Sequence, residues 1–521
     1  MSPVQSARTD HADRTSDEAG VATVGGSGPT GWGADVRETH SAVVLLMGDR
    51  AYKVKKPVDL GFLDFTTRAA REAAIRRELV LNRRLTPDVY LGVLEVRDAD
   101  GRPCEHLLVM RRMPEDRRLS TLVRAGADVA PDLRRLAKDL AAFHATARTG
   151  ADIASSGSAP ALRKRWEDNV QGLRDHPVTT VGAELADQVE ELALEFVDGR
   201  APLLDSRVAA GLVRDGHGDL LADDIFCLPD GPRALDCLDF SDELRWMDVL
   251  DDAACLATDL ERLGSPHLGA QFLHDYAEYS GTREPPALRH HYAAYRAVMR
   301  AKVAAIRAAG HHTHTGPDAD EAALLCDIGV AHLRRGRVRL VLVGGPPGSG
   351  KSTLSAALAD RLGAVLVGSD AERKALAGVA ATVHVPAAFG EGIYTAGMTA
   401  RTYASLADRA ARLLGMGETV VVDALFAAAG LREQFRALAR AGSTPVVELV
   451  CSARTAVVED RLRARAARPD AVSDADLPVG RRLAALSDPW PEASVVHTGS
   501  SRQTAVAQAL HHLGTGPDEP A

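Results

Sequence analysis

One stretch decides the fold of the C-terminal part of this chain: Val341-Leu-Val-Gly-Gly-Pro-Pro-Gly-Ser-Gly-Lys-Ser-Thr353. It satisfies the pattern G-x-x-x-x-G-K-[ST], a β-forming run (338–343) precedes it, and a helical run (351–362) follows it. Glycines let backbone N–H groups converge on phosphate oxygens, and the next helix presents the positive end of its dipole. The stretch therefore predicts a nucleoside triphosphate site. Its expected phosphate-binding residues are Gly345, Pro346, Pro347, Gly348, Ser349, Gly350, Lys351, Ser352 and Thr353.

Two residues of this loop and one acid downstream are expected to carry the chemistry of the site. Lys351 is expected to reach the β- and γ-phosphates, and the Ser352 hydroxyl is expected to hold Mg²⁺. Glu418-Thr-Val-Val-Val-Asp423 is a run of β-formers closed by an acid, which is typical of a buried parallel strand. Asp423 is expected to orient the Mg²⁺ shell. The alternative is that Asp423 only caps the next turn.

A second acid and an arginine-rich helix complete the candidate site. Asp370 closes another β-forming run, and the carboxyl ends of parallel strands are where open α/β sheets bind ligands. Arg461, Arg465 and Arg468 step by four and three, so they share one helical face. Such a helix can deliver guanidinium groups to a transferring phosphoryl group, where negative charge develops. A solvated basic face is the alternative.

The N-terminal part of the chain contains a lysine–glutamate pattern. Ala51-Tyr-Lys-Val-Lys55 alternates with period two, so Lys53 and Lys55 lie on one face of the expected strand. A helix is expected over residues 67–85, with Glu78 on its inward side. Protein-kinase-like folds hold the α- and β-phosphates with such a lysine and glutamate. Solvated lysines on an edge strand are the alternative, and the pattern does not choose between Lys53 and Lys55.

Two further acids follow this pattern in the order that a kinase requires. Asp219 lies in His217-Gly-Asp219-Leu, and Asp236 ends an apolar run at Leu235-Asp236. Asp219 is expected to accept the proton of an attacking hydroxyl, and Asp236 is expected to hold Mg²⁺ against the nucleotide phosphates. The alternative is that Asp219 caps a turn and Asp236 ends a strand.

Residues 34 to about 310 resemble an aminoglycoside phosphotransferase-like kinase. The motifs that carry the resemblance are Tyr52-Lys53-Val54, Glu78, His217-Gly-Asp219-Leu and Leu235-Asp236, followed by Asp248 as the structural aspartate. The resemblance implies a two-lobed, protein-kinase-like α+β fold with ATP and Mg²⁺ as cofactors. The family has Asn five residues after the catalytic Asp as a second Mg²⁺ ligand, and this chain has Asp224 there, which offers oxygen ligands but adds a negative charge. The family's glycine-rich loop is not recognisable ahead of Lys53.

From about residue 338 onward the chain resembles small P-loop kinases related to gluconate kinase and to the zeta-toxin/AAA-33 group. The matching features are the phosphate loop, Ser369-Asp370…Arg373, Val422-Asp423 and the arginine helix. The resemblance implies an α/β P-loop NTPase domain with a parallel sheet. In those families the acid after the second strand orients or deprotonates the acceptor hydroxyl, a role that carries over to Asp370. Together, the two resemblances look like the bacterial fusion called a bifunctional aminoglycoside phosphotransferase/ATP-binding protein.

The expected domain organisation follows from these assignments. Residues 1–33 are polar, lack apolar periodicity and are expected to form a disordered tail. Residues 34–315 form the kinase-like domain, with an N-lobe to about 110 and a C-lobe from about 111. Residues 316–337 form a linker helix, and residues 338–521 form the P-loop domain. His311-His-Thr-His314 is interpreted as polar linker in preference to a metal site, because no partner His or Cys pattern accompanies it.

Composition narrows the functional classes. The net charge of −9 argues against a nucleic-acid binder that relies on phosphate contacts. The chain contains no apolar run of about 18 residues or more, which argues against a membrane-spanning helix. The six scattered cysteines contain no C-x-x-C pair and are expected to be reduced. A cytoplasmic location is therefore expected.

The function expected from the sequence is transfer of the γ-phosphoryl group of ATP to a hydroxyl group of a small molecule by two kinase-like modules. The acceptors expected are a sugar, an amino sugar or an aminoglycoside-like compound. One alternative is a catalytic C-terminal module regulated by an N-terminal pseudokinase that senses nucleotide or ligand. Another is a C-terminal ATPase with a mechanical role or one linked to nucleic acid.

Overall fold

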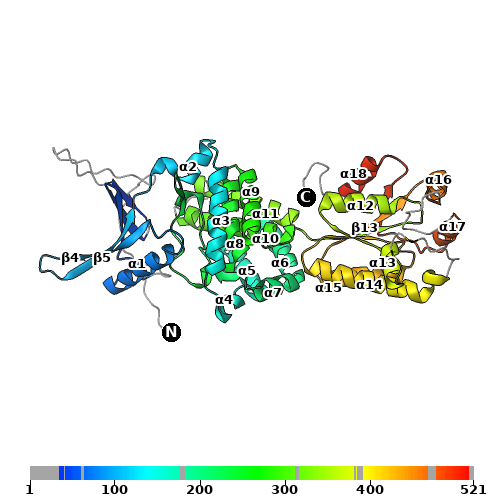
Figure 1. The fold of residues 1–521 in the computed structure, drawn as a ribbon, viewed down its shortest axis with the longest axis horizontal. Helices are drawn as coiled ribbons and strands as arrows, with labels where there is room; N and C mark the ends of the chain where they lie inside the picture. The colour runs from blue at the N-terminus through cyan, green and yellow to red at the C-terminus, as the bar shows by residue number, and fades with distance from the viewer. Residues whose placement is uncertain are drawn as a thin grey trace, which may run out of the picture. The chain divides into compact units, whose positions relative to one another are not determined.

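The computed structural model describes residues 35–39, 41–59, 64–176, 182–310, 316–380, 383, 391–466 and 477–514 (Figure 1). The expected tail (1–33) and His311–His314 lie outside these residues. The chain divides into two compact units. The first contains residues up to Phe143 and the segment Asp219–Asp242, and the second contains the segments 144–218 and 243–521. No helix in the described ranges is long and apolar enough to cross a membrane.

The first unit is built on a five-stranded antiparallel sheet with the order β1-β2-β3-β5-β4. The strands are β1 (Asp35–Glu38), β2 (Ala42–Met47), β3 (Arg50–Lys55), β4 (Tyr90–Arg97) and β5 (Pro103–Arg111). Helix α1 (Arg68–Asn82) packs on β4 and β5, and the Thr67 hydroxyl caps it by accepting a hydrogen bond from the Ala70 N–H at 3.2 Å. Ile75, Tyr90 and Leu108 are buried in this core. The sheet and α1 thereby fix the positions of β3 and Glu78.

The rest of the first unit contributes a hairpin beside this core. Its strands are β7 (Ile225–Leu228) and β8 (Gly231–Ala234), and the short helix η2 (Ala222–Asp224) precedes them. The hairpin places Phe226 and Leu228 in the same cluster as α1. The remaining elements are η1 (Glu115–Arg117), α2 (Leu119–Arg124) and the part of α3 (Ala130–Thr146) up to Phe143.

The second unit begins with a helical part. Its helices are α4 (Ala151–Ser155), α5 (Ala159–Asp175), α6 (Ala183–Gly199), α7 (Ala201–Ala209), α8 (Val249–Arg262), α9 (Pro266–Ser280), α10 (Pro286–Gly310) and α11 (Pro317–Arg335). A small antiparallel pair joins β6 (Val213–Asp215) to β9 (Trp246–Asp248), with η3 (Glu243–Arg245) before β9. Helix α8 is buried over most of its length because other helices pack against it.

The second unit ends with a five-stranded parallel sheet with the order β11-β12-β10-β13-β14. The strands are β10 (Leu340–Gly344), β11 (Val365–Gly368), β12 (Val420–Asp423), β13 (Val446–Ser452) and β14 (Ser494–His497). The helices are α12 (Lys351–Leu362), α13 (Ser369–Leu376), α14 (Ala396–Gly415), α15 (Ala429–Ala441), α16 (Thr455–Ala466), α17 (Leu477–Ala485) and α18 (Arg502–His512), with η4 (Gly392–Tyr394) before α14. Figure 1 shows α12 and α18 on one face of the sheet and α14 and α15 on the other.

The central strand β10 explains why this sheet is stable. Leu340, Val341, Leu342 and Val343 are fully buried, since helices cover both faces of the strand. Each such side chain contributes about 1.5–3 kcal/mol on burial. The structure thus has the two-lobed kinase-like elements and the parallel P-loop sheet that the sequence predicts, and the expected fold class is confirmed.

Two element boundaries in the structure differ from those expected from the sequence. Helix α1 ends at Asn82 and not at Leu85, because the N–H groups of Arg84 and Leu85 bond to carbonyls three residues back and no longer four. The strand before Asp370 ends at Gly368, and Asp370 lies in the first turn of α13. The acid is therefore held by a helix start and not by a strand end.

Candidate functional sites

The phosphate loop connects β10 to α12 through three glycines in left-handed backbone conformations. The φ angles are +134° at Gly345, +82° at Gly348 and +92° at Gly350. A Cβ at Gly345 would lie 2.9 Å from the Cys451 carbonyl oxygen, and one at Gly350 would lie 3.1 Å from Arg461. These positions therefore require glycine on both conformational and steric grounds.

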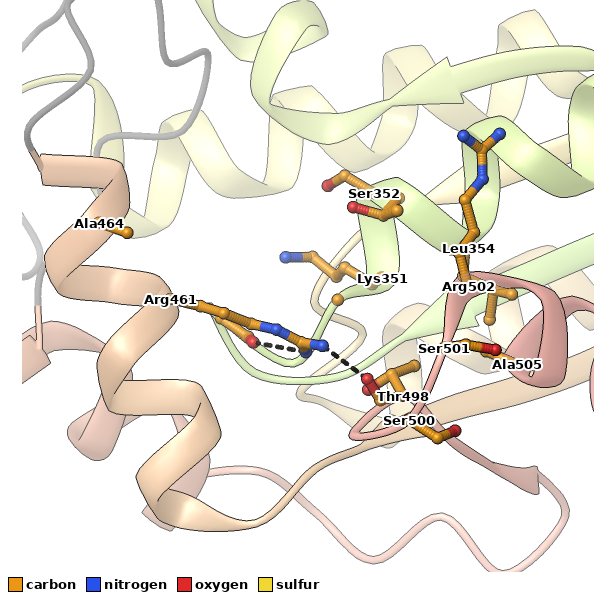
Figure 2. A pocket seen from close by; sticks show the side chains of 13 residues that line it. Lys351, Ser352, Leu354, Arg461, Ala464, Thr498, Ser500, Ser501, Arg502 and Ala505 are labelled. Carbon is orange, nitrogen blue, oxygen red and sulfur yellow. Dashed lines mark hydrogen bonds between the residues drawn. The ribbon is translucent and has the colours of Figure 1, made fainter.

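The loop borders a cavity of about 360 Å³. Its lining residues are Gly348, Gly350, Lys351, Ser352, Thr353, Leu354, Arg461, Ala464, Thr498, Ser500, Ser501, Arg502 and Ala505. Figure 2 shows Lys351 and Ser352 extending from the first turn of α12 and Arg461 reaching the loop from α16. The cavity therefore brings together the loop and Arg461, one of the three arginines on the expected helical face.

Arg461 is tied to the backbone of the loop region. Its guanidinium group donates to the Thr498 carbonyl at 2.6 Å and to the Gly348 carbonyl at 3.5 Å. The backbone of Arg465 continues α16, but its side chain and residues 467–476 lie outside the described part of the structure. Arg461 thus forms one wall of the cavity, and the role of Arg465 stays a prediction.

Asp423 lies near Lys351 and Ser352, and Asp370 lies close enough to Asp423 to affect its pKa. Burial raises the pKa of Asp423, while Lys351 and a hydrogen bond from the Ser352 hydroxyl oppose the shift, and Asp370 adds to it. The Asp423 Oδ1 atom is buried and has no hydrogen-bond partner. A buried carboxylate oxygen beside a phosphate loop suits a Mg²⁺ shell, since Mg²⁺ prefers oxygen ligands.

Sequence reasoning missed the segment Thr498–Arg502 on the other side of the loop. The Thr498 hydroxyl donates to the Ser349 carbonyl, and the Ser501 hydroxyl caps α18 by accepting from the Thr504 N–H at 3.1 Å. A β-forming run followed by Gly499-Ser-Ser501 is a strand-to-helix turn with a capping serine, and this was the available signal.

In the first unit, Glu78 forms ion pairs with two lysines. Lys53 Nζ lies 2.8 Å from Glu78 Oε1, and Lys55 Nζ lies 2.9 Å from Oε2. Burial opposes ionisation of Glu78, but the two ammonium groups prevail and lower its pKa to about 2. The prediction that the lysines share a face of β3 and meet Glu78 is confirmed, and the edge-strand alternative is wrong because β3 lies between β2 and β5.

The two lysines differ in their second partners. Lys53 contacts Asp236 Oδ1 at 3.1 Å, and Lys55 contacts Asp239 Oδ2 at 3.0 Å. Burial alone would lower the pKa of Lys53, whereas Asp236 and Glu78 raise it well above its ordinary value. Asp236 has φ +61°, a strained conformation for a non-glycine residue, and its N–H donates to the Tyr90 hydroxyl at 3.0 Å. Lys53 thus links the helix glutamate to the proposed metal-binding acid.

Asp219, Asp224 and Asp236 form an electrostatic cluster. Burial, together with the charges of Asp236 and Asp219, raises the pKa of Asp224 to about 8. A divalent cation would relieve this repulsion with the oxygen ligands that it prefers, so the residue types fit Mg²⁺. Within the described ranges, no group of three or more His, Cys, Asp or Glu side chains has metal-binding geometry. The roles of Asp224 and Asp236 as ligands therefore stay predictions.

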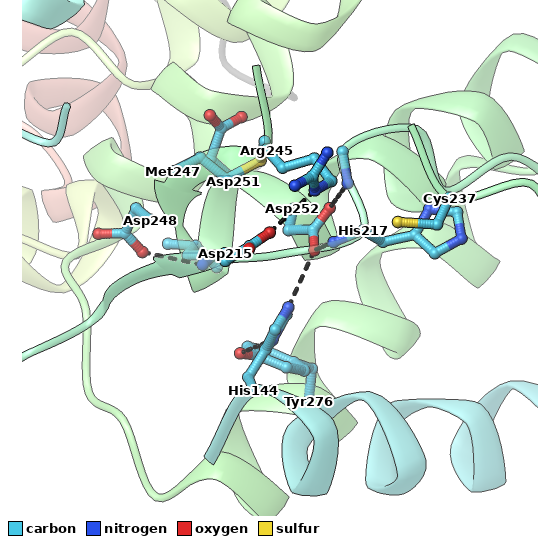
Figure 3. A network of polar contacts seen from close by, with 12 residues as sticks. His144, Asp215, His217, Cys237, Arg245, Met247, Asp248, Asp251, Asp252 and Tyr276 are labelled. Atoms are coloured by element: carbon cyan, nitrogen blue, oxygen red, sulfur yellow. Dashed lines mark hydrogen bonds and ion pairs between the residues drawn. The ribbon is translucent and has the colours of Figure 1, made fainter. Parts of the chain in front are cut away.

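In the second unit, Asp252 holds the loop that leads to Asp219. Its carboxylate accepts from the His217 N–H at 2.6 Å and from the Gly218 N–H at 2.9 Å (Figure 3). His144 Nε2 lies 3.0 Å from the same carboxylate. A Cβ at Gly216 would lie 2.4 Å from Asp252 Oδ2, so only glycine permits this approach.

Further ion pairs fix the segments around this loop. Arg207 binds Asp248 through two hydrogen bonds of 2.7 and 2.6 Å, and Arg296 donates to Asp251 at 2.6 Å and to the Gly218 carbonyl at 3.1 Å. Asp248 also caps α8 through the Leu250 N–H. The structural role predicted for Asp248 agrees with this geometry, whereas Asp252, His144 and Arg296 carried no recognisable motif.

Comparison with curated proteins identifies the family. The chain is 40% identical over 477 residues to the uncharacterized protein Rv2004c of Mycobacterium tuberculosis strain H37Rv, and the match covers 92% of this chain and 95% of the relative. The chain belongs to the family of this mycobacterial protein. Residues 340–489 of this chain match the AAA domain model AAA_33.

Two solved structures have similar parts. A choline/ethanolamine kinase family protein from Mesorhizobium loti is 17% identical, with a TM-score of 0.36, over 60% of this chain and 94% of its own. A sugar kinase from Janibacter sp. HTCC2649 is 21% identical, with a TM-score of 0.27, over 34% of this chain and 96% of its own.

Proposed function

We propose that this protein is a phosphotransferase with two ATP- and Mg²⁺-dependent modules, each of which phosphorylates a hydroxyl group of a small molecule. The observation that carries the proposal is the phosphate-loop cavity, which Lys351 and Ser352 line and which has the buried carboxylate of Asp423 nearby. An ordinary strand–helix turn does not need three glycines at positive φ around an open cavity.

In the C-terminal module, the chain's own residues supply a phosphate cradle and a base. The backbone of the loop and Lys351 bind the β- and γ-phosphates, and Asp370 accepts the proton of the acceptor hydroxyl. The hydroxyl oxygen bonds to the γ-phosphorus as the bond to the ADP oxygen breaks. Mg²⁺, when bound at Ser352 and Asp423, neutralises phosphate charge.

In the N-terminal module, the contacts of Lys53 support the same chemistry. Lys53 is held by Glu78 and Asp236 at 2.8 and 3.1 Å, in position to bind nucleotide phosphates. Asp219 accepts the proton of the attacking hydroxyl, and Asp224 and Asp236 are the proposed metal ligands. The hydrogen bonds from His217 and Gly218 to Asp252 hold the loop in place, so less entropy is lost when the reactants are aligned.

The test is ATP consumption by the full chain against a panel of sugars, amino sugars and aminoglycosides. Asp219→Asn is expected to abolish acceptor-stimulated turnover in the N-terminal module, and Lys351→Ala in the C-terminal one. If turnover with one acceptor is lost in just one of the two variants, that acceptor belongs to the module that carries the substitution. If neither variant alters any turnover, the proposal is wrong.

A second candidate is a catalytic C-terminal module with an N-terminal nucleotide sensor. The observation that favours it is Asp224, because its raised pKa, about 8, leaves a protonated carboxyl group at neutral pH where the related kinases carry Asn. A sensor binds ATP without consuming it. Retained nucleotide binding with acceptor-independent turnover that only Lys351→Ala removes would favour this candidate.

A further inference from the structure

A second, larger cavity lies in the helical part of the second unit, and its lining residues come from one end of α8, α9, α10 and α11. Its volume is about 530 Å³, and it shares no lining residue with the phosphate-loop cavity. Its charged and titratable lining residues are Glu261, His267, Arg289, His290, His332 and Arg335. None of them belongs to either candidate nucleotide site.

The helices do not set the sign of the potential in this cavity. α9 begins at Pro266 and α10 begins at Pro286, while α8 ends at Arg262 and α11 ends at Arg335. Two positive and two negative helix ends therefore lie at the same end of the bundle, and their dipoles oppose one another. The side chains decide which ligands the cavity favours.

The one acidic lining residue is already engaged. Glu261 Oε2 lies 2.7 Å from His332 Nε2, and His332 Nδ1 lies 2.8 Å from His290 Nδ1. Burial, together with the charges of His332, Arg335 and Arg289, lowers the pKa of His290 to about 3. His290 is therefore neutral at physiological pH, and the negative charge of Glu261 is turned toward His332.

One guanidinium group at this cavity has no acid partner, and the other is only partly satisfied. Arg289 Nε forms an ion pair with Glu284 Oε1 at 3.4 Å, but it is buried and makes no hydrogen bond. In the described part of the chain, Arg335 has no ion-pair partner, and its charge acts on the pKa of both His290 and Glu261. Guanidinium groups pair well with phosphate and carboxylate oxygens.

The remaining walls are small and largely apolar. They include Ala257, Ala270, Leu273 and Ala293. Such walls suit a compact carbon skeleton, while the arginines suit an anionic group. We propose that this cavity binds a small anionic metabolite, with a phosphate or carboxylate group held by Arg289 and Arg335 and the skeleton against the alanine-lined wall.

The test is isothermal titration of the full chain, in a Lys351→Ala background that weakens anion binding at the phosphate loop. The probes are inorganic phosphate, glucose 6-phosphate and citrate. Arg335→Ala is expected to weaken binding about tenfold or more, because it removes a charge-assisted hydrogen bond. Ala270→Phe, which fills the cavity from an exposed position, is expected to abolish binding.

Arg334→Ala is the matched control, because Arg334 is the neighbouring exposed arginine of α11 and donates to Gln188 at 3.0 Å. It is expected to leave the affinity unchanged. Binding of the two phosphate probes alone supports a phosphorylated ligand, and binding of citrate alone supports a carboxylate. The proposal is overturned if no probe binds, or if Arg335→Ala binds as tightly as Arg334→Ala. If Ala270→Phe does not fold, the comparison of Arg335→Ala with Arg334→Ala tests the proposal by itself.

Discussion

Lys53 and Lys55 occupy equivalent positions on one face of β3 but differ in exposure and in their second partner. Lys53 is 16% exposed and contacts Asp236, while Lys55 is 5% exposed and contacts Asp239. We predict that Lys53→Ala abolishes nucleotide binding by the N-terminal module and changes stability little. Lys55→Ala is expected to lower the free energy of unfolding by about 3–5 kcal/mol, because it removes the ion-pair partner of the buried Glu78 Oε2 atom and of Asp239.

The measurement pairs titration of a fluorescent ATP analogue with chemical unfolding, each in a Lys351→Ala background. Loss of nucleotide binding in Lys55→Ala with unchanged stability would instead make Lys55 the phosphate-binding lysine.

The raised pKa of Asp224 makes the stability of the folded chain depend on pH. Burial, together with the charges of Asp236 and Asp219, raises this pKa to about 8, so the folded chain holds a proton that the unfolded chain releases near pH 4. Stability therefore falls as the pH rises from about 4 to about 8, because folding requires proton uptake in that range. We predict that Asp224→Asn melts at a higher temperature than the wild type, and that the difference grows between pH 5 and pH 8.5 without divalent cations.

Asp230→Asn is the control, since Asp230 is 61% exposed and its ion pair with Arg233 lies at the surface. Its melting difference is expected to stay near zero at both pH values. An equal difference for Asp224→Asn at both pH values would contradict the assigned pKa.

At the scale of the element, α12 offers a matched pair of glycines. Gly350 starts the helix with φ +92°, and Gly363 ends it with φ +57°. A Cβ at Gly350 would lie 3.1 Å from Arg461 and 3.2 Å from Thr498, whereas one at Gly363 meets open space. We predict that Gly350→Ala weakens ATP binding to the C-terminal module about tenfold or more, because about 1–3 kcal/mol of strain distorts the loop.

Gly363→Ala is expected to cost about 1–2 kcal/mol of stability and to leave the affinity for ATP unchanged. Titration and thermal melting of both variants, in an Asp219→Asn background, provide the comparison. Equal affinities would show that the crowding at Gly350 does not shape the loop.

At the scale of the whole molecule, Arg200 ties the helical part of the second unit to the parallel-sheet part. It is 1% exposed and donates to the Leu414 carbonyl at 2.9 Å and to the Thr444 hydroxyl at 2.7 Å, with longer bonds to Gly442 and Ser443. Burial lowers its pKa to about 10, so it stays charged at neutral pH. We predict that Arg200→Met lowers the free energy of unfolding by about 1–3 kcal/mol, because the buried Leu414 carbonyl and Thr444 hydroxyl lose their hydrogen-bond donor.

Thermal melting and limited proteolysis measure the effect, with Arg440→Ala as the control because Arg440 is 64% exposed. Unchanged melting in Arg200→Met would mean that these hydrogen bonds contribute nothing net to the junction.

Local patterns in the sequence were sufficient for the fold class and for much of the candidate sites. The phosphate loop is a contiguous motif whose glycine spacing reflects backbone geometry, and the period-two alternation of β3 places Lys53 and Lys55 on one face regardless of context. Both assignments depend on interactions within a few residues, which is why a single sequence reveals them.

Other features depend on segments that are far apart in the chain. Three such features have no short motif, because each joins residues from separate elements. They are the contacts of Asp252 with His144 and His217, the contact of Thr498 with the phosphate loop, and the junction at Arg200. Asp224 looked like an ordinary substitution until burial beside Asp219 and Asp236 shifted its pKa. Residue types and their spacing determined the kind of chemistry, while only tertiary packing decided which charges are buried together, because burial and electrostatic coupling depend on distance in space and not on distance along the chain.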